Sequence, residues 1–405
     1  MDGHAQNDAF SPYRVDDLVL LVGENPLPNA VAARLLLKPG GKAWLVKSSG
    51  TRDEAQLLAR YLRQHGFEVP EIRREINEAS PTSILDTALS ILDKASGPNV
   101  GVNYTGGTKV MATHSYRAAE VWAHEHARQV WLSYLDARRQ EMVFTRSGKV
   151  EEATVPLSSC PVAVSLNELR QLHGLGGSPD DHPLPPFSRT AEVIAKEIPS
   201  MGAEAWKLWK EALKTGGEPR PTCPGLKRIE SALREEAGLS AGVRLTKQVL
   251  ARARGCTEHP IALWADGAWL EQHVLTVLQG LAGEVGLTDC ARGYQTDAPH
   301  FELDVLAMRY HQLFVFSCGT TLRRDDSAFR ECKLKLMEAR TRARQFGGDE
   351  AAVALICLLD GGCLQHLRSQ VPDDDRLYVF GLPDLRDLRS RLKDWILTQV
   401  AAPGA

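Results

Sequence analysis

One short run in this chain has residue types that suit the binding of a phosphate or a ribose: Asn103-Tyr104-Thr105-Gly106-Gly107-Thr108-Lys109-Val110-Met111. It lies between an apolar segment and a helix-like one, and its adjacent glycines let the backbone approach a ligand without a Cβ in the way. The N–H groups of a helix start, a threonine hydroxyl and a lysine ammonium would converge there. The Walker and G-x-G-x-x-G spacings are absent. Residue types alone leave open a phosphorylated ligand or an ordinary Gly-rich turn.

The whole run, N-x-T-G-G-T-K-x-M, resembles the signature of CARF domains (CRISPR-associated Rossmann folds) that are fused to PD-(D/E)xK nucleases in type III CRISPR systems. The segment 23–29 is similar to the first loop of that family. The resemblance implies a homodimer that binds a cyclic oligoadenylate, usually cyclic tetra-adenylate, across its interface. The implied ligand-binding residues are Thr105, Gly106, Gly107, Thr108 and Lys109, with Asn29 and Ser49 from neighbouring loops.

The C-terminal part carries two further matches to the same family. Gly267-Ala268-Trp269-Leu270-Glu271 looks like its G-[GA]-W-L-E, and Glu302-Leu303-Asp304-Val305 looks like its E-L-D-V. The resemblance makes Glu271 and Asp304 the carboxylates that hold Mg²⁺ or Mn²⁺ for phosphodiester hydrolysis. The family's next strand ends in Glu-x-Lys, but this chain reads Ser317-Cys318-Gly319 there.

That replacement removes a carboxylate and a lysine from the implied catalytic site. With Ser317 and Gly319 as degenerate partners, Glu271 and Asp304 supply too little charge for tight metal binding. Losing one transition-state stabiliser commonly costs about 10²–10³ in rate. Lys335 resembles a lysine that the family carries on the following helix and is a candidate substitute. The triplet 331–333 repeats Glu-x-Lys, but within a helix-like run where its two charges face apart.

The elements that position these residues follow from hydrophobic periodicity. In the N-terminal part, apolar runs at 18–22, 43–46, 100–102 and 130–135 alternate with amphipathic stretches, which predicts an α/β fold with a parallel sheet and crossover helices. Ligands bind beyond the carboxyl ends of such strands. The loops at 23–29, 48–51 and 105–109 are therefore expected at one edge.

Three domains are predicted along the chain. Residues 1–175 form a Rossmann-like, CARF-like sensing domain that closes with a hairpin (142–145 and 152–155) and a helix (166–173). Residues 176–261 form a connector, with a linker at 174–189 and basic helices after it. Residues 262–405 form an α/β, restriction-endonuclease-like domain with helices at 264–285, 327–346 and 385–400 and strands at 302–306, 313–316, 352–359 and 377–380.

Composition excludes few partners by itself. The formal net charge is −3, but residues 201–255 carry an excess of lysine and arginine, typical of solvated helix faces or of the wall of a nucleic-acid groove. Eight scattered cysteines fit reduced thiols, and Cys357, Cys363 and His366 lack a fourth metal ligand. No run approaches the roughly 18 apolar residues of a membrane span. We expect a cytoplasmic protein without a membrane partner.

Four functions fit the sequence. The first is a homodimeric cyclic oligoadenylate sensor whose nuclease-like part is impaired. The second is a nuclease for DNA or RNA that the same ligand activates, with a substituted third metal ligand. The third is slow cleavage of the ligand by the sensing domain itself, and the fourth is a nucleotide-responsive DNA-binding regulator. The loss at positions 317 and 319 favours the first over the second.

Overall fold

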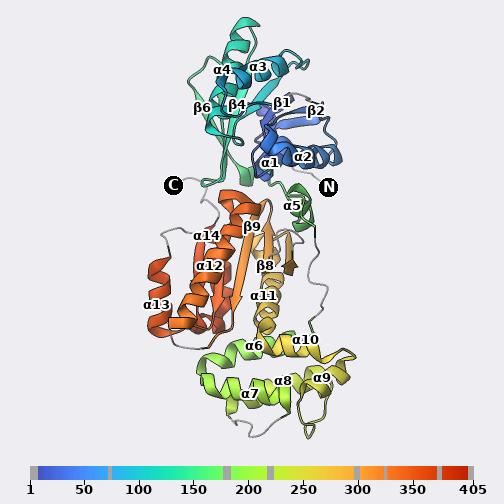
Figure 1. Cartoon of the computed structure of the whole chain (residues 1–405), viewed down its shortest axis with the longest axis vertical. Coiled ribbons are helices and arrows are strands. Elements are labelled where there is room, and N and C mark those ends of the chain that lie inside the picture. The colour runs from blue at the N-terminus through green and yellow to red at the C-terminus, as the bar shows by residue number, and fades with distance from the viewer. Residues whose placement is uncertain are drawn as a thin grey trace, which may run out of the picture.

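The protein contains two β-sheets and a separate group of helices, arranged along one long axis (Figure 1). The computed structural model describes residues 8–71, 75–176, 184–216, 223–295, 302–322, 326–371 and 376–399. The predicted linker lies partly outside these residues. Its last residues, Ser188 and Arg189, begin a helix instead.

The first sheet has the strand order β2-β1-β3-β4-β5-β6. Its first four strands pair in parallel and the last two add an antiparallel hairpin. The predicted parallel strands and hairpin are therefore confirmed. The strands are β1 (Val15–Leu21), β2 (Leu37–Val46), β3 (Val100–Asn103), β4 (Val130–Asp136), β5 (Glu141–Arg146) and β6 (Glu152–Pro156).

Helices cover both faces of this sheet. α1 and α2 share a core with one face, and α3 and α4 share a core with the other. The helices are α1 (Leu27–Leu36), α2 (Arg52–Gln64), α3 (Pro81–Leu92) and α4 (Lys109–Glu125). α1 begins inside the segment that the sequence analysis treats as a loop, because Pro26 and Pro28 fit a first helical turn, which needs no proline N–H. The loop after β1 is therefore shorter than predicted.

The second sheet has the order β11-β10-β9-β8-β7. β8 runs antiparallel to both of its neighbours, and β9, β10 and β11 are parallel. The strands are β7 (Asp289–Gln295), β8 (Glu302–Arg309), β9 (Gln312–Gly319), β10 (Ala352–Cys357) and β11 (Leu377–Phe380). The predicted strands are confirmed in place, and β7 is one that the sequence analysis missed.

Three helices cover the two faces of the second sheet. α11 (Trp269–Val285) lies on one face with α14 (Leu388–Thr398), and α12 (Asp326–Gly347) lies on the other. The predicted helix at 264–285 begins as a π-helical turn over Trp264–Ala268. The predicted terminal helix is likewise two pieces, a 3₁₀ turn over Leu382–Asp387 and then α14. α13 (Gly361–Gln370) was not predicted.

The connector is a group of short helices at the far end of the molecule (Figure 1). They are α6 (Ser188–Glu197), α7 (Ala203–Thr215), α8 (Pro224–Ala237), α9 (Lys247–Arg254) and α10 (Glu258–Leu263). Trp206 and Trp209 stack at 5.1 Å between ring centroids, and both are buried with Trp269 of α11. The connector thus shares its hydrophobic core with the second sheet.

The two sheets meet through α5 (Leu166–Leu172) and the segment before it. The Val164 N–H donates to the Tyr310 carbonyl at 2.9 Å, and the Leu166 N–H donates to Oδ2 of Asp289 at 2.9 Å. One hydrophobic cluster includes residues of both sheets. Within the described residues, no helix is long and apolar enough to cross a membrane.

Candidate functional site

The loops after β1 and β3 touch each other at the carboxyl edge of the first sheet. A Cβ on Gly23 would lie 3.0 Å from the backbone nitrogen of Gly107, and a side chain on Gly106 would collide with the Leu21 carbonyl. Gly107 has a φ of 73°, in the left-handed region that favours glycine. Both glycines of the motif are therefore needed for this close approach of two loops.

The motif's threonines hold the loop, and its lysine is free to reach outward. Oγ1 of Thr108 accepts the Met111 N–H at 3.2 Å and caps α4. Oγ1 of Thr105 accepts the Leu135 N–H at 2.8 Å and ties the loop to β4. Lys109 is exposed as the first residue of α4. The start of α4 thus offers a positive helix end beside an exposed ammonium, which favours an anion.

The two residues assigned from neighbouring loops differ in their placement. Asn29 is fully buried, and its Nδ2 donates to the Leu21 carbonyl at 2.8 Å. Its side chain braces the end of β1 behind the glycines instead of facing solvent. Ser49 is exposed in the 3₁₀ turn Ser49–Thr51 that follows β2. Of these two, Ser49 is the one open to a ligand.

An aromatic cluster beside the motif was missed by the sequence analysis. Tyr104 stacks on Tyr134 with ring centroids 5.8 Å apart, and it meets Tyr116 of α4 edge-on at 5.6 Å. Tyr134 lies near the carboxyl end of β4 and is 39% exposed. Exposed aromatic rings are platforms on which nucleobases stack. The sequence signal that could have indicated this cluster was the position of Tyr104 within the glycine motif.

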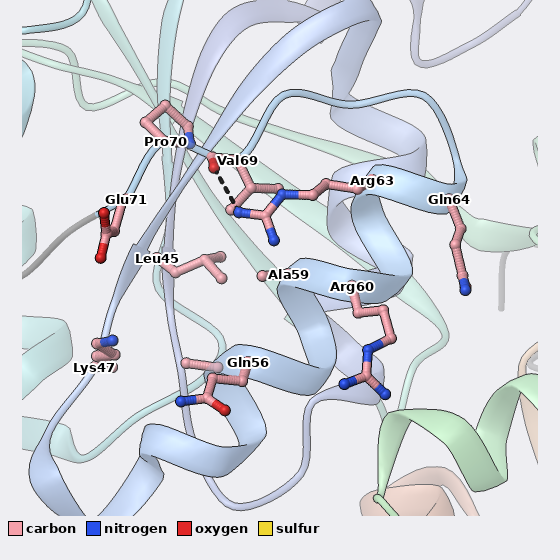
Figure 2. A pocket seen from close by; sticks show the side chains of 11 residues that line it. Leu45, Lys47, Gln56, Ala59, Arg60, Arg63, Gln64, Val69, Pro70 and Glu71 are labelled. Carbon is pink, nitrogen blue, oxygen red and sulfur yellow. Dashed lines mark hydrogen bonds between the residues drawn. The ribbon is translucent and has the colours of Figure 1, made fainter.

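A hollow of about 630 Å³ lies between α2 and the edge strand β2 (Figure 2). Its lining includes the cations Lys47, Arg60 and Arg63, together with Glu71. One guanidinium nitrogen of Arg63 donates to the Val69 carbonyl at 2.9 Å, as the dashed line in Figure 2 shows. This polar hollow is separate from the glycine loop, because β2 and β3 lie on opposite sides of β1.

On the second sheet, Asp304 is held by donors from the neighbouring strand. Its Oδ2 accepts the Ser317 hydroxyl at 3.2 Å and the Cys318 N–H at 2.6 Å. Ser317 therefore occupies the place implied for the second carboxylate and acts as a donor to the first. Oδ2 of Asp304 thus accepts hydrogen bonds from protein groups where a metal ion would otherwise bind it.

Glu271, near the start of α11, is paired with an arginine that the sequence analysis missed. Arg292 on β7 lies 3.1 Å from its carboxylate, and both side chains are mostly buried. Burial and the nearby negative charge of Asp304 raise the pKa of Glu271 to about 7, and Arg292 partly offsets both effects. The guanidinium supplies part of the positive charge that a metal would otherwise supply to this carboxylate.

Lys335 of α12 reaches the same strand end, where its Nζ donates to the Cys318 carbonyl at 2.9 Å. It lines a cavity of about 220 Å³ with Asp304 and Ser317. Glu302, Glu338 and Arg342 line the same cavity and were not singled out from the sequence. Gly319, at the end of β9, is buried and lies next to Cys332 and Cys357. Lys335 thus brings a cation close to the position implied for the family's lysine.

Where Mg²⁺ or Mn²⁺ would bind, the carboxylates already have cationic neighbours: Arg292 beside Glu271, and Lys335 and Arg342 in the cavity of Asp304. Within the described ranges, no group of three or more His, Cys, Asp or Glu side chains is placed to hold a metal ion. The repeated triplet stays on α12, as predicted: Glu331 accepts the Thr321 hydroxyl at 2.8 Å, and Lys333 donates to Gln370 at 2.6 Å. His366 lies against Phe329 at 4.8 Å between ring centroids.

The architecture is the predicted α/β one: a Rossmann-like first sheet with helices on both faces, followed by a second mixed sheet that is also covered by helices. No protein-family model and no curated protein matches this chain in sequence. Solved structures do match it over nearly its whole length, and the identities of 13–17% establish a shared fold.

Protein VC1899 from Vibrio cholerae superimposes with a TM-score of 0.68 and 13% identity, covering 95% of this chain and 99% of that one. Can2 from Sulfobacillus thermosulfidooxidans, solved in complex with cyclic tetra-adenylate, gives 0.67 and 14%, covering 96% and 99%. A type III CRISPR defence DNA nuclease activated by cyclic oligoadenylate gives 0.50 and 17%, covering 89% of this chain and 53% of that one.

Proposed function

We propose that this chain is a sensor of a cyclic oligoadenylate, cyclic tetra-adenylate in the simplest case, in type III CRISPR antiviral defence. The observation that carries the proposal is the contact between the loops of Gly23 and Gly107, which joins two loops beside the exposed Lys109. The fold shared with Can2, which was solved with cyclic tetra-adenylate, supports the choice of ligand. Lys109 contacts a phosphate of the ring, and the backbone of Gly106 and Gly107 lies against it.

The ligand binds at the interface of a homodimer in this proposal. A ring with internal twofold symmetry is matched best by two copies of the same loops, which an isologous pair presents. Tyr134, exposed near the carboxyl end of β4, stacks on an adenine base. Ligand binding then shifts the dimer between two arrangements only in so far as one arrangement binds the ring more tightly.

The nuclease-like site is impaired in this proposal. Its two carboxylates are engaged by protein donors, Asp304 by Ser317 and Cys318 and Glu271 by Arg292. The site then binds a phosphodiester weakly through Lys335 without cutting it, or the effect of ligand binding is carried out by another protein. One observation favours the alternative of metal-dependent cleavage of DNA or RNA, because Glu302 and Glu338 bring further carboxylates to the cavity of Asp304.

Isothermal titration of the full chain with cyclic tetra-adenylate tests the sensing function. Replacing Lys109 by alanine removes a charge-assisted contact to phosphate, and we expect affinity to fall by about 10- to 100-fold, the equivalent of about 1.5–3 kcal/mol. Lys94→Ala is the matched control, since Lys94 is an exposed lysine between α3 and the amino end of β3. Equal affinity in the Lys109 and Lys94 variants would remove this loop from the site.

A further inference from the structure

The loop after β1 touches the turn that ends α12, so the sensing domain contacts the helix that lines the nuclease-like cavity. We infer that Asn25 is a positioning residue through which a ligand at the glycine loop acts on Gly348 and α12. This inference rests on the proposed sensing function, and it names how that site is connected to the second one.

Asn25 has one end fixed in the sensing domain and the other end pointed at the second domain. Its Oδ1 accepts the N–H of Leu27, the first residue of α1, at 2.9 Å. Its Nδ2 is buried and makes no hydrogen bond to the described residues. That nitrogen lies 2.7 Å from the position that a Cβ on Gly348 would take. Gly348 also has a φ of 71°, so both its backbone and its neighbour favour a glycine.

Glu350 lies on the other side of the same glycine. Its side chain is 1% exposed, and neither carboxylate oxygen is bonded to the described residues. Its carboxyl carbon is 3.9 Å from the same Cβ position on Gly348. A buried amide donor and a buried carboxylate, neither with a hydrogen-bond partner among the described residues, therefore flank one residue. Unpaired buried polar groups are costly. A small shift of the loop after β1 that brought Nδ2 of Asn25 to the Glu350 carboxylate would therefore be favoured.

A second contact ties the same turn to the sensing domain. One nitrogen of Arg376 donates to the carbonyls of Ala137 at 2.6 Å and Arg138 at 3.1 Å, in the turn between β4 and β5. Its other terminal nitrogen donates to the Asp349 carbonyl. The turn Gly348–Glu350 is thus held against two loops of the first sheet, and a shift of one loop would rotate the turn about the other.

α12 can carry that movement to the cavity. It begins at Asp326 and ends at Gly347, directly before the turn. A helix of that length spans about 33 Å as one rigid element. It carries Lys335, Glu338 and Arg342, which line the cavity, and Lys335 is bonded to the end of β9. A displacement at Gly348 would therefore change the contacts that Lys335 makes beside Asp304.

Hydrogen exchange followed by mass spectrometry, with and without cyclic tetra-adenylate, tests this on the full chain. In the wild type, we expect the ligand to protect both the glycine loop (104–110) and the end of α12 with its turn (341–352). Asn25→Ser keeps an acceptor for the Leu27 N–H and removes the amide donor. We expect this variant to keep protection of 104–110 and to lose that of 341–352. Asn77→Ser is the control, since Asn77 caps an exposed turn through Ala79 at 3.1 Å.

The double variant Asn25→Asp with Glu350→Gln exchanges donor and acceptor across Gly348, and we expect it to restore protection of 341–352. Failure of this rescue, or protection of 341–352 in Asn25→Ser equal to that in Asn77→Ser, overturns the inference. Protection of 104–110 alone in the wild type overturns the inference and leaves the sensing function standing. Protection of neither segment contradicts the sensing function itself, and the inference with it.

Discussion

At the scale of single residues, the two candidate sites differ in how their charges are used. At the glycine loop, Lys109 is exposed and the threonines Thr105 and Thr108 are used to hold the backbone. At the nuclease-like site, Glu271 and Asp304 are both engaged by protein donors. The first arrangement leaves a cation available to an incoming anion. In the second arrangement, protein donors already balance part of the negative charge that would attract a metal ion.

A base-stacking role makes Tyr134 a sensitive position. Base–aromatic stacking is worth about 1–3 kcal/mol per base, so Tyr134→Ala is expected to weaken cyclic tetra-adenylate binding by about 5- to 100-fold. Tyr134→Phe keeps the ring and is expected to bind as the wild type does. Fluorescence-detected binding of the ligand to both variants checks this. Equal affinities for the alanine and phenylalanine variants would show that the exposed ring of Tyr134 does not touch a base.

Motif residues were predictable from the sequence, and their partners were not. The glycines and Lys109 were found because a turn motif is local. Arg292 reaches Glu271 from β7, and Glu338 shares a cavity with Asp304 from α12. These partners are set by the pairing of distant elements, for which a single sequence carries no local signal. Asn29 shows the converse, because a polar residue in the right loop is used to brace the strand end.

At the scale of elements, regular alternation was read correctly and irregular elements were missed. The four parallel strands of the first sheet follow from short apolar runs between amphipathic helices. β7 was not predicted because Arg292 and Gly293 interrupt its apolar pattern. α13 was not predicted because it begins with two glycines. The first residues of α1 were assigned to the loop 23–29 on its similarity to the family's first loop, whereas Pro26 and Pro28 fit a first helical turn.

The turn that ends α12 gives the protein a dependence on pH. Burial raises the pKa of Glu350 to about 7, against a partial offset from Arg376 and with Asp349 adding to the shift. The folded carboxyl therefore holds its proton more tightly than the unfolded one. Between about pH 4.5 and 7 the folded state binds more protons, so its free energy of unfolding falls as pH rises and levels off above that range.

Glu350→Gln removes this titration. Wild type is expected to lose about 2 kcal/mol more than the variant between pH 5 and pH 8, an order-of-magnitude value for a shift of this size. Urea denaturation at the two pH values measures the difference. Parallel losses in the two proteins would mean that Glu350 is ionised without cost, and that its carboxylate finds partners at the domain junction.

At the scale of the whole molecule, the two sheets share a hydrophobic cluster and several hydrogen bonds. They are therefore packed against each other and not connected by the chain alone. The connector helices pack into the core of the second sheet. In the proposed connection, a change in the loops of the first sheet would reach the second through the turn at Gly348, which directly follows α12.

Cleavage assays separate the two readings of the second domain. Full-length protein with Mn²⁺ and cyclic tetra-adenylate is expected to leave plasmid DNA and single-stranded DNA and RNA uncut, at the level of Asp304→Asn. The physical reason is the loss of a carboxylate at Ser317 and the pairing of Glu271 with Arg292. Ligand-dependent cutting that disappears in both Asp304→Asn and Glu338→Gln would instead make Glu338 the substituted ligand.

Native mass spectrometry of the full chain with cyclic tetra-adenylate tests the central claim most directly. Two copies of the glycine loop should hold one twofold-symmetric ring, so the account predicts a complex of two chains and one ring. The complex should persist in Lys94→Ala and be lost in Lys109→Ala. Absence of any bound ring at micromolar concentrations, or equal retention of the ring by both variants, would contradict the account.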